Sequence, residues 1–316
     1  HQKVFWQFGI KPNEKKTNMG VNRNTNLHAA KKVKNDEFYT KLSDVENELR
    51  HYKTHVKDKI VYCNCDDPNW SSFYKYFTLN FKHLGLKKVI TTHYSKDISS
   101  DPAYMEECIL DSDGNTQITR TTLKGDGDFR SEECITLLHQ ADIVCTNPPF
   151  SLFREYIGLL VKMKKSFLVI GSQNAITYKE IFPLIMNNDV WLGISKPKVF
   201  STPQGEEKKF GNICWYTNLM HANRLQKIRL WKKYSTSEYP KYDNYNAIEV
   251  GKVAEIPMDY DDEMGVPITF LEKYNPDQFY IIGLDRYAKG NKTPNKRFLI
   301  TGNEIYARIL IKRKTY

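Results

Sequence analysis

Long apolar runs, a signal peptide and a cysteine framework are all missing from this sequence of 316 residues. No stretch is apolar enough to span a bilayer, and the N-terminus has no continuous apolar segment, which argues against membrane-spanning and secreted proteins. The six cysteines are scattered and form no C-x-x-C pair, so we predict reduced thiols and no metal site. Together these absences predict a cytoplasmic protein.

Acidic residues are also in short supply. The 37 Asp and Glu are outnumbered by 47 Lys and Arg, which gives a net charge of +10 and a pI near 9.1. Such a balance favours a polyanionic partner, with nucleic acid first and an anionic membrane surface second. Aromatic residues make up 13% of the chain and include 20 Tyr, which suits stacking on bases. The hydrophobic content of 40% is enough for a buried core.

The sequence does have a distinctive polar motif, Asn147, Pro148, Pro149 and Phe150, directly after the apolar run 141–146. At the end of a strand, the Asn147 oxygen and a carbonyl of the rigid Pro pair can each accept one hydrogen from an sp2-bound NH2 group. Phe150 offers a flat face for a planar base or amide, and such stacking is worth ~1–3 kcal/mol. The motif predicts group transfer to adenine, cytosine or a glutamine amide, with a Pro-rich turn as the structural alternative.

The chain begins with a polar, Lys- and Asn-rich stretch, residues 1–34, which we predict to be a flexible basic arm. Because Met19 and Gly20 resemble a start, residues 1–18 are interpreted as an extension or a cloning remnant. Farther on, strands and helices alternate, which predicts right-handed crossovers and a parallel sheet. The expected strands are 59–64, 87–92, 142–146 and 166–171, and the expected helices cover 72–83 and begin at 131 and 151.

Local signals add detail to this alternation. The pair Asp113-Gly114 between two β-prone runs predicts an inserted hairpin. Segments 190–194 and 212–218 are expected to pair antiparallel at the edge of the sheet. Ser43 and Thr177 each have a Glu three residues later, and these capping boxes predict helix starts.

After residue 219 the composition becomes basic and aromatic. Residues 224–233 contain five cations and no acid, with Trp231 among them. We predict that this segment contacts DNA, and a solvated basic helix face is the alternative. The predicted DNA-binding residues are Arg224, Lys227, Arg229, Lys232 and Lys233.

Polar side chains also follow the other expected strands. In a doubly wound parallel sheet, ligands bind outside the carboxyl ends of the strands, where the strand order reverses. Asn64, Asp66 and Asp67 follow the first strand, and Asp126 and Asp128 follow the hairpin. Carboxylates at such loop ends can accept hydrogen bonds from a ribose, a cationic amine or an exocyclic NH2 group. With the motif at 147–150, they predict one ligand site at this edge.

Seven motifs in a fixed order resemble the EcoRI-type adenine-specific DNA methyltransferases, over residues 19 to 280. These motifs are 36–40, 61–68, 125–130, 146–153, 175–180, 240–245 and 265–270. The resemblance implies a Rossmann-like class I methyltransferase fold of the α/β class, with a mostly parallel sheet, an antiparallel edge hairpin and S-adenosylmethionine as cofactor. It also implies transfer to N6 of a flipped-out adenine in double-stranded DNA, within a restriction–modification system.

The same resemblance assigns roles to residues that match the family motifs. The implied catalytic residues are Asn147, Pro148, Pro149 and Phe150, and the implied cofactor-binding residues are Phe38, Tyr39, Thr40, Asn64, Asp66, Asp67, Asp126, Asp128 and Phe129. The chain departs from the wider methyltransferase pattern at two points. Residues 63–68 contain no Gly, and no acidic residue directly follows the second strand, where Asp97 is only a candidate for binding the ribose.

The order of the motifs predicts how the chain is divided. Because the cofactor motifs precede the catalytic one with little chain between them, we expect a catalytic domain at 35–219 and a DNA target-recognition region at 220–316. We expect a monomer, and a cognate restriction endonuclease that acts on the same DNA site without direct contact. The alternative functions are protein-glutamine and RNA N-methylation at the same amine site.

Overall fold

The structure is a computed structural model that describes residues 39–201 and 207–314. These residues all fall in one compact unit. The predicted basic arm at 1–34 and the predicted cofactor residue Phe38 lie outside the described residues, and the side chain of Tyr39 does so as well.

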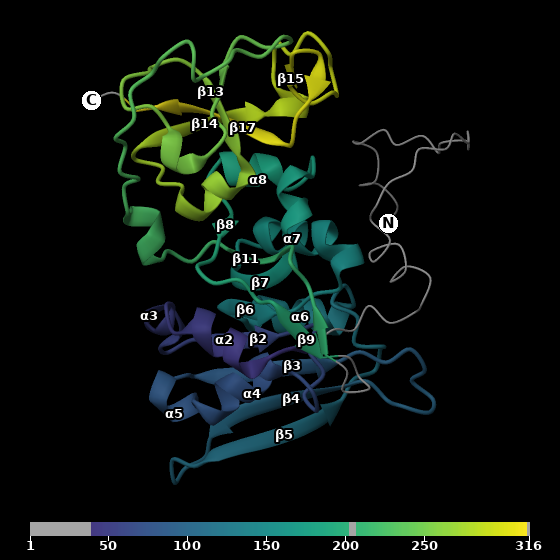
Figure 1. Ribbon diagram of the computed structural model, residues 1–316. Helices are drawn as coiled ribbons and strands as arrows, with labels where there is room; N and C mark the ends of the chain where they lie inside the picture. The colour runs from purple at the N-terminus through teal and green to yellow at the C-terminus, as the bar shows by residue number, and fades with distance from the viewer. Residues whose placement is uncertain (1–38, 202–206, 315–316) are drawn as a thin grey trace, which may run out of the picture. The chain divides into compact units, whose positions relative to one another are not determined.

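An eight-stranded mixed sheet has the order β5-β4-β3-β2-β6-β7-β11-β8 (Figure 1). The four central strands β3, β2, β6 and β7 are parallel, whereas the hairpin β4–β5 and strand β11 pair antiparallel with their neighbours. This arrangement confirms the predicted α/β class with a mostly parallel sheet and an antiparallel edge hairpin. The strands are β2 (Ile60–Cys63), β3 (Lys88–His93), β4 (Tyr104–Leu110), β5 (Thr116–Thr122), β6 (Ile143–Thr146), β7 (Ser166–Ser172), β8 (Trp191–Leu192) and β11 (Ile213–Thr217).

Helices cover both faces of this sheet. Because successive side chains on a strand point to opposite faces, Val61 and Cys63 pack with α2 and α4, while Tyr62 packs with α6 and α7. The four central strands are therefore buried on both sides, as parallel strands generally are, whereas β5 at the edge is exposed. The helices are α2 (Leu42–Leu49), α3 (Lys53–Val56), α4 (Ser72–Leu79), α5 (Phe81–Leu84), α6 (Glu132–Gln140), α7 (Phe153–Lys162) and α8 (Phe182–Met186).

The C-terminal part contains a four-stranded sheet of order β12-β13-β17-β14. Its side chains Met264, Phe279 and Ile311 belong to the same buried cluster as Phe182 and Ile185 of α8. The two predicted regions thus share a core, and the boundary near residue 219 stays a prediction. These strands are β12 (Ile248–Glu249), β13 (Met264–Pro267), β14 (Phe279–Leu284) and β17 (Arg308–Arg313).

Smaller elements complete the described residues. The short strands are β1 (Tyr39–Thr40), β9 (Val199–Ser201), β10 (Glu207–Lys209), β15 (Leu299–Ile300) and β16 (Asn303–Glu304). The 3-10 helices are η1 (Phe150–Leu152), η2 (Gln173–Thr177), η3 (Ala222–Leu225), η4 (Val253–Glu255), η5 (Ile268–Lys273) and η6 (Asp285–Tyr287).

Several local predictions are confirmed. The Asp113-Gly114 pair lies in the turn between β4 and β5, where Gly114 has a φ of 77°. Strands β8 and β11 pair antiparallel, as predicted for segments 190–194 and 212–218. The expected helix at 72–83 is present but is divided at Asn80 into α4 and α5.

Both capping-box predictions are wrong. Helix α2 begins at Leu42, one residue before Ser43, because the Lys41 carbonyl already accepts the first helical hydrogen bonds. The Thr177 hydroxyl donates to the Asn174 carbonyl and so closes η2, while α8 begins only at Phe182. In both cases a neighbouring backbone group satisfies the helix end in place of the expected side chain.

Candidate active site

The predicted site lies at the point where the strand order reverses. The chain passes from β2 to β3 on one side and returns to β6 on the other, so the loops after β2 and β6 flank the reversal. These two loops carry residues 64–68 and the motif at 147–150, which we call the catalytic turn after the role that the sequence predicts for it. Across the gap between the strand ends, the Cys65 backbone N–H donates to Thr146 Oγ1 at 3.1 Å.

The buried carboxylate of Asp66, which is 7% exposed, joins these two loops. Its Oδ1 accepts from the Ser71 hydroxyl at 2.9 Å, and its Oδ2 accepts from the Thr146 hydroxyl. Oδ2 also accepts from the Asn147 backbone N–H at 3.3 Å. Both carboxylate oxygens are therefore bonded to protein donors, and Asp66 ties the backbone of the catalytic turn to the loop after β2.

Ionisation of Asp66 lowers the folding stability of the protein, but the ionised form makes the hydrogen bonds to the catalytic turn. Burial raises the pKa of Asp66 from 3.8 to about 6, although hydrogen bonds from Thr146, Ser71 and Asn147 lower it. Because the folded pKa is raised, the contribution of Asp66 to stability is greatest below pH 3.8 and is lost as the pH rises through 6. The ionised form at neutral pH costs on the order of 3 kcal/mol of folding stability. Only this form accepts all three hydrogen bonds.

Asn64 is buried at the same strand end. Its Oδ1 accepts from the Tyr156 hydroxyl, and its carbonyl accepts from the Thr92 hydroxyl at 3.2 Å. Among the described residues, its buried Nδ2 has no hydrogen-bond partner, and the same is true of buried Thr40 Oγ1. Buried polar atoms are normally paired, so both positions suit contact with a polar ligand.

Asp67 belongs to a second polar group at the end of β3. Its Oδ2 lies 2.9 Å from His93 Nδ1, and its Oδ1 accepts from the Asn69 backbone N–H at 2.8 Å. The other ring nitrogen of His93 lies 2.9 Å from Asp101, and the ring stacks on Tyr104 with centroids 4.9 Å apart. The imidazole is thus held between two carboxylates. The sequence did not single out His93 as part of this polar group.

The segment after the hairpin brings Asp126, Asp128 and Phe129 to this edge. The Asp126 carbonyl accepts from the Ser95 backbone N–H at 2.8 Å, and the Asp126 side chain is exposed. Arg130 donates to both carboxylate oxygens of Asp128, at 2.8 and 2.7 Å, and this pairing lowers the pKa of Asp128. Phe129 is buried, and its ring meets that of Tyr156 edge-on at 5.1 Å. Asp126 is therefore the accessible carboxylate of the pair.

Gly127 determines how closely this segment approaches β3. It has a φ of +76°, and a Cβ at this position would collide with the His93 carbonyl oxygen. We expect Gly127→Ala to lower the free energy of unfolding by about 1–3 kcal/mol from backbone strain alone and to weaken cofactor binding. The matched control is Gly125→Ala, since a Cβ there meets only ordinary contact with Glu133. Thermal unfolding of both variants tests this, and equal stability would contradict it.

The catalytic turn itself is compact. The Pro149 carbonyl accepts from the Leu152 backbone N–H at 3.0 Å as the chain enters η1. None of the hydrogen bonds among the described residues uses the Pro148 carbonyl. Phe150 is half-buried and packs against the cluster that contains Val61 and Cys63. The Pro148 carbonyl, which has no competing donor among the described residues, is therefore the better placed of the two Pro carbonyls to accept a hydrogen from an amine.

Residues 26–314 match the protein family described as Adenine-specific methyltransferase EcoRI. The chain belongs to this family. Type II methyltransferase M.EcoRI of Escherichia coli is 45% identical over 323 residues, which cover 91% of this chain and 96% of that protein. M.MgeORF184P of Mycoplasma genitalium and M.MpnI of Mycoplasma pneumoniae, also type II methyltransferases, are 36% and 35% identical, each over 91% of this chain and 98% of the relative. No solved structure matches.

The EcoRI-type family confirms the predicted identity of the chain as an adenine-specific DNA methyltransferase. It also agrees with the α/β fold described above. A methyltransferase needs a methyl donor, and DNA is the substrate of this class. In the part of the chain that the structure describes, no helix is long and apolar enough to cross a membrane. The described residues include no cluster of three or more His, Cys, Asp or Glu suited to a metal ion.

The predicted DNA-binding segment of this methyltransferase is only partly exposed. Arg224 is 5% exposed; its guanidinium donates to Asn188 Oδ1 at 2.9 Å and lies 4.4 Å from the ring centre of Trp191. Lys232 is half-buried and lies 3.6 Å from Glu238. The remaining three cations, Lys227, Arg229 and Lys233, are exposed. Arg224 is thus enclosed by protein, and the segment has no α-helix.

Three residues that the sequence did not single out make hydrogen bonds to the candidate site residues of this EcoRI-type methyltransferase. Thr146 and Ser71 donate to Asp66, and Tyr156 donates to Asn64. Thr146 could have been found, because it directly precedes Asn147 at the end of a strand. Tyr156 gives no local signal, since it lies 92 residues from its partner.

Proposed function

We propose that this methyltransferase transfers the methyl group of S-adenosylmethionine to N6 of a flipped-out adenine in double-stranded DNA. We further propose that it is the modification component of a restriction–modification system, that it acts in the cytoplasm as a monomer, and that a cognate endonuclease reads the same site without touching it. The observation that supports the transfer most directly is the bond between Asp66 and the Asn147 backbone, which fixes the catalytic turn at the strand reversal.

The residues of the chain fit S-adenosylmethionine as the donor. The buried atoms Asn64 Nδ2 and Thr40 Oγ1, which have no partner within residues 39–201 and 207–314, are suited to its polar groups, and Asp126 offers an accessible carboxylate. When bound, S-adenosylmethionine supplies an electrophilic methyl carbon on a sulfonium centre. We propose that Asn64, Thr40 and Asp126 hold it, and that Asp66 and Asp67 shape the loop after β2 beside it.

The catalytic turn then orients the target amine. The Asn147 side-chain oxygen and the Pro148 carbonyl each accept one amine hydrogen, which directs the nitrogen lone pair at the methyl carbon. No covalent enzyme intermediate is needed, because the methyl carbon is already electrophilic and the amine nitrogen only has to be aligned with it. Asp66 holds the Asn147 backbone in place for this alignment.

Phe150 is proposed to stack on the flipped adenine. Rotating a base out of the duplex costs a few kcal/mol, and stacking on an aromatic ring returns ~1–3 kcal/mol. We therefore expect Phe150→Ala to lower kcat/KM for DNA by about 5- to 150-fold, with the affinity for S-adenosylmethionine unchanged. Phe150→Tyr keeps the ring and is the matched control. Steady-state kinetics with plasmid DNA test this, and an Ala variant as fast as the Tyr variant would remove the stacking role.

A transfer assay with labelled S-adenosylmethionine distinguishes the proposed substrate from the alternatives. Purified protein is given unmethylated duplex DNA, structured RNA and a protein mixture in parallel reactions. We expect label in the duplex DNA alone. Label in RNA or in a protein amide instead would retain the amine site at Asn147 but reject DNA as the substrate.

A further inference from the structure

A chain of contacts leads from the catalytic turn to the C-terminal region. Arg154, at the start of α7, lies 3.7 Å from Glu180 and 5.3 Å from the ring centre of Tyr178. The neighbouring Lys179 ammonium lies 5.4 Å from the ring centre of Tyr287 in η6. The segment that follows β7 at the carboxyl edge is thus in contact with η6.

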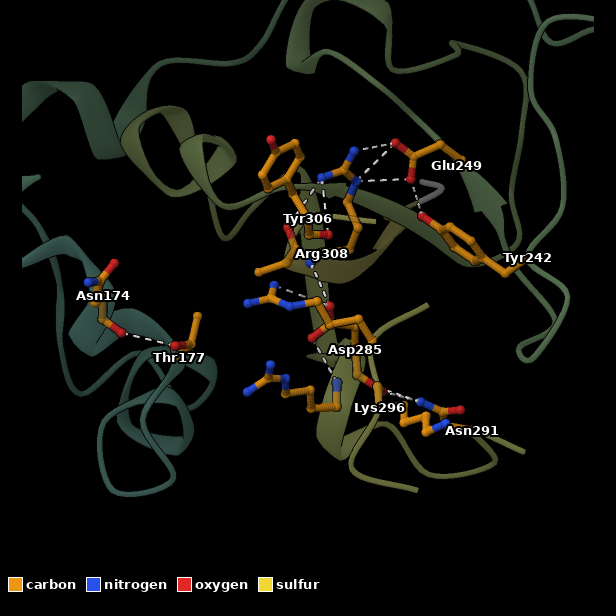
Figure 2. A network of polar contacts seen from close by, with 12 residues as sticks. Asn174, Thr177, Tyr242, Glu249, Asp285, Asn291, Lys296, Tyr306 and Arg308 are labelled. Carbon is orange, nitrogen blue, oxygen red and sulfur yellow. Dashed lines mark hydrogen bonds and ion pairs between the residues drawn. The ribbon is translucent and has the colours of Figure 1, made fainter. Parts of the chain in front are cut away.

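Figure 2 shows η2 and η6 in one close view. Asn174 and Thr177, from η2 at the end of β7, are bonded to each other and lie to the left of Asp285 at the start of η6. Above Asp285 in this view, Arg308 donates to Glu249 at 2.5 to 2.9 Å, and this largely buried pair anchors β17 (Figure 2). The segment that follows η6 therefore begins at a fixed position, close to the carboxyl edge of the large sheet.

Residues 286–298, which we call the braced loop, have little regular structure but are held by two buried asparagines. Asn291 Nδ2 donates to the carbonyls of Asp285 and Lys296, at 3.0 and 2.9 Å (Figure 2). Asn244 Nδ2 donates to the Thr293 hydroxyl and to the Arg297 carbonyl, at 2.6 and 3.0 Å. These bonds replace the backbone ladder that a helix or strand would provide, so the loop has a defined shape.

The braced loop presents positive charge to solvent. It contains five cations and no acid. Four of them, Arg286, Lys289, Lys292 and Lys296, are exposed, and among the described residues none forms an ion pair with an acidic side chain. The fifth, Arg297, is half-buried and lies 3.9 Å from Asp285. A hydrogen-bonded loop that presents several exposed cations is typical of a surface that binds a polyanion.

We propose that the braced loop binds the phosphate backbone of the substrate duplex beside the flipped base. This inference rests on the proposed function, because it takes duplex DNA as the polyanion that must reach the catalytic edge. The fixed shape of the loop places Arg286, Lys289, Lys292 and Lys296 against the backbone without a large loss of conformational entropy on binding. Phosphate contacts of this kind set register and orientation and carry no sequence information.

The test replaces the four exposed cations of the braced loop with Gln in the full chain. A matched control replaces four exposed lysines near the amino ends of β2 and β3, and a third variant replaces the exposed cations of segment 224–233. The loop substitutions are R286Q, K289Q, K292Q and K296Q; the controls are K57Q, K59Q, K82Q and K87Q; the third set is K227Q, R229Q and K233Q.

Fluorescence anisotropy with a 30-base-pair duplex at several salt concentrations measures binding, and S-adenosylmethionine affinity verifies that each variant is folded. We expect the loop variant to raise the Kd for DNA at least about tenfold, with a slope of log K against log salt that is shallower by about 3 to 4 units. The amino-edge control should keep the wild-type slope. KM for plasmid DNA should rise in the loop variant while kcat at saturating DNA is retained.

The remaining outcomes contradict either the braced loop as a DNA contact or the proposed function of the enzyme. A loop variant with the slope and KM of the amino-edge control would overturn the braced loop as a DNA contact. If only the variant of segment 224–233 loses affinity, DNA contact belongs to that segment and the loop proposal fails. A wild-type protein that binds duplex DNA but transfers no methyl group would contradict the proposed function, and the binding slopes would still decide the loop.

Discussion

Asn147→Ala is expected to lower methyl transfer at least about 100- to 1000-fold, because it removes an acceptor that orients the amine only in the transition state. The affinity for S-adenosylmethionine should stay within about threefold of wild type, since the bond that fixes this residue to Asp66 is made by its backbone N–H. Single-turnover rates with saturating DNA and cofactor measure the effect on the chemical step.

Asn147→Asp is the matched control for this prediction. Asp keeps an oxygen at the position that accepts from the amine, so it should retain more activity than Ala. Equal losses in both variants would indicate a general collapse of the turn, which the cofactor affinity would also report. An Ala variant that transfers within about tenfold of wild type would reject Asn147 as the residue that orients the amine.

Asp66→Asn is expected to lower kcat by about 10- to 100-fold, because misplacing a reacting group by about 1 Å has an effect of this size. Oδ2 of Asp66 accepts from both the Thr146 hydroxyl and the Asn147 backbone N–H, and Oδ1 accepts from Ser71. An amide has one oxygen and one NH2 group, so it cannot accept from all three donors. The catalytic turn would then lose its tie to the loop after β2.

The pH profile separates this positioning role from a purely structural one. Burial raises the pKa of Asp66 to about 6, and only its ionised form accepts all three bonds. Wild-type kcat should therefore be half-maximal near pH 6, rise to its full value at higher pH and fall at lower pH, whereas Asp66→Asn should lack this acid limb. Ser71→Ala removes a bond that lowers the pKa, so its acid limb should move to higher pH. Identical profiles for wild type and Asp66→Asn would show that this carboxylate does not govern turnover.

The sequence predicted those features of the site that depend on local pattern. Apolar runs that end in polar residues located the ends of β2 and β6, and the rule on strand reversal placed Asn64, Asp66 and Asn147 at one edge. The Asp113-Gly114 turn was also readable, because its two residues specify the hairpin. The parallel centre and antiparallel edges of the sheet followed from the order of the elements.

Features that depend on distant partners were not predictable. Asp66 and Thr146 are 80 residues apart, so nothing near either residue signals the bond between them. Arg224 belongs to a basic run that looks exposed, yet Trp191 and Tyr274 enclose its guanidinium from other parts of the chain. The braced loop was missed for the same reason, since Asn244 lies about 50 residues from the backbone that it supports.

Two capping boxes failed for a more local reason. Ser43 and Thr177 have the right residue types at the right spacing, but backbone carbonyls at Lys41 and Ile181 accept the first helical bonds. Cap preferences are worth only about 1 kcal/mol, so the packing of α2 and α8 decides where those helices begin.

The most direct test of the central claim is mass spectrometry of nucleosides from unmethylated duplex DNA that has been incubated with the purified protein and S-adenosylmethionine. We predict N6-methyladenine as the methylated nucleoside, absent when the Asn147→Ala variant is used. A product of N4-methylcytosine or C5-methylcytosine, or DNA without any methylated base under conditions in which the cofactor binds, would contradict the proposed transfer to adenine.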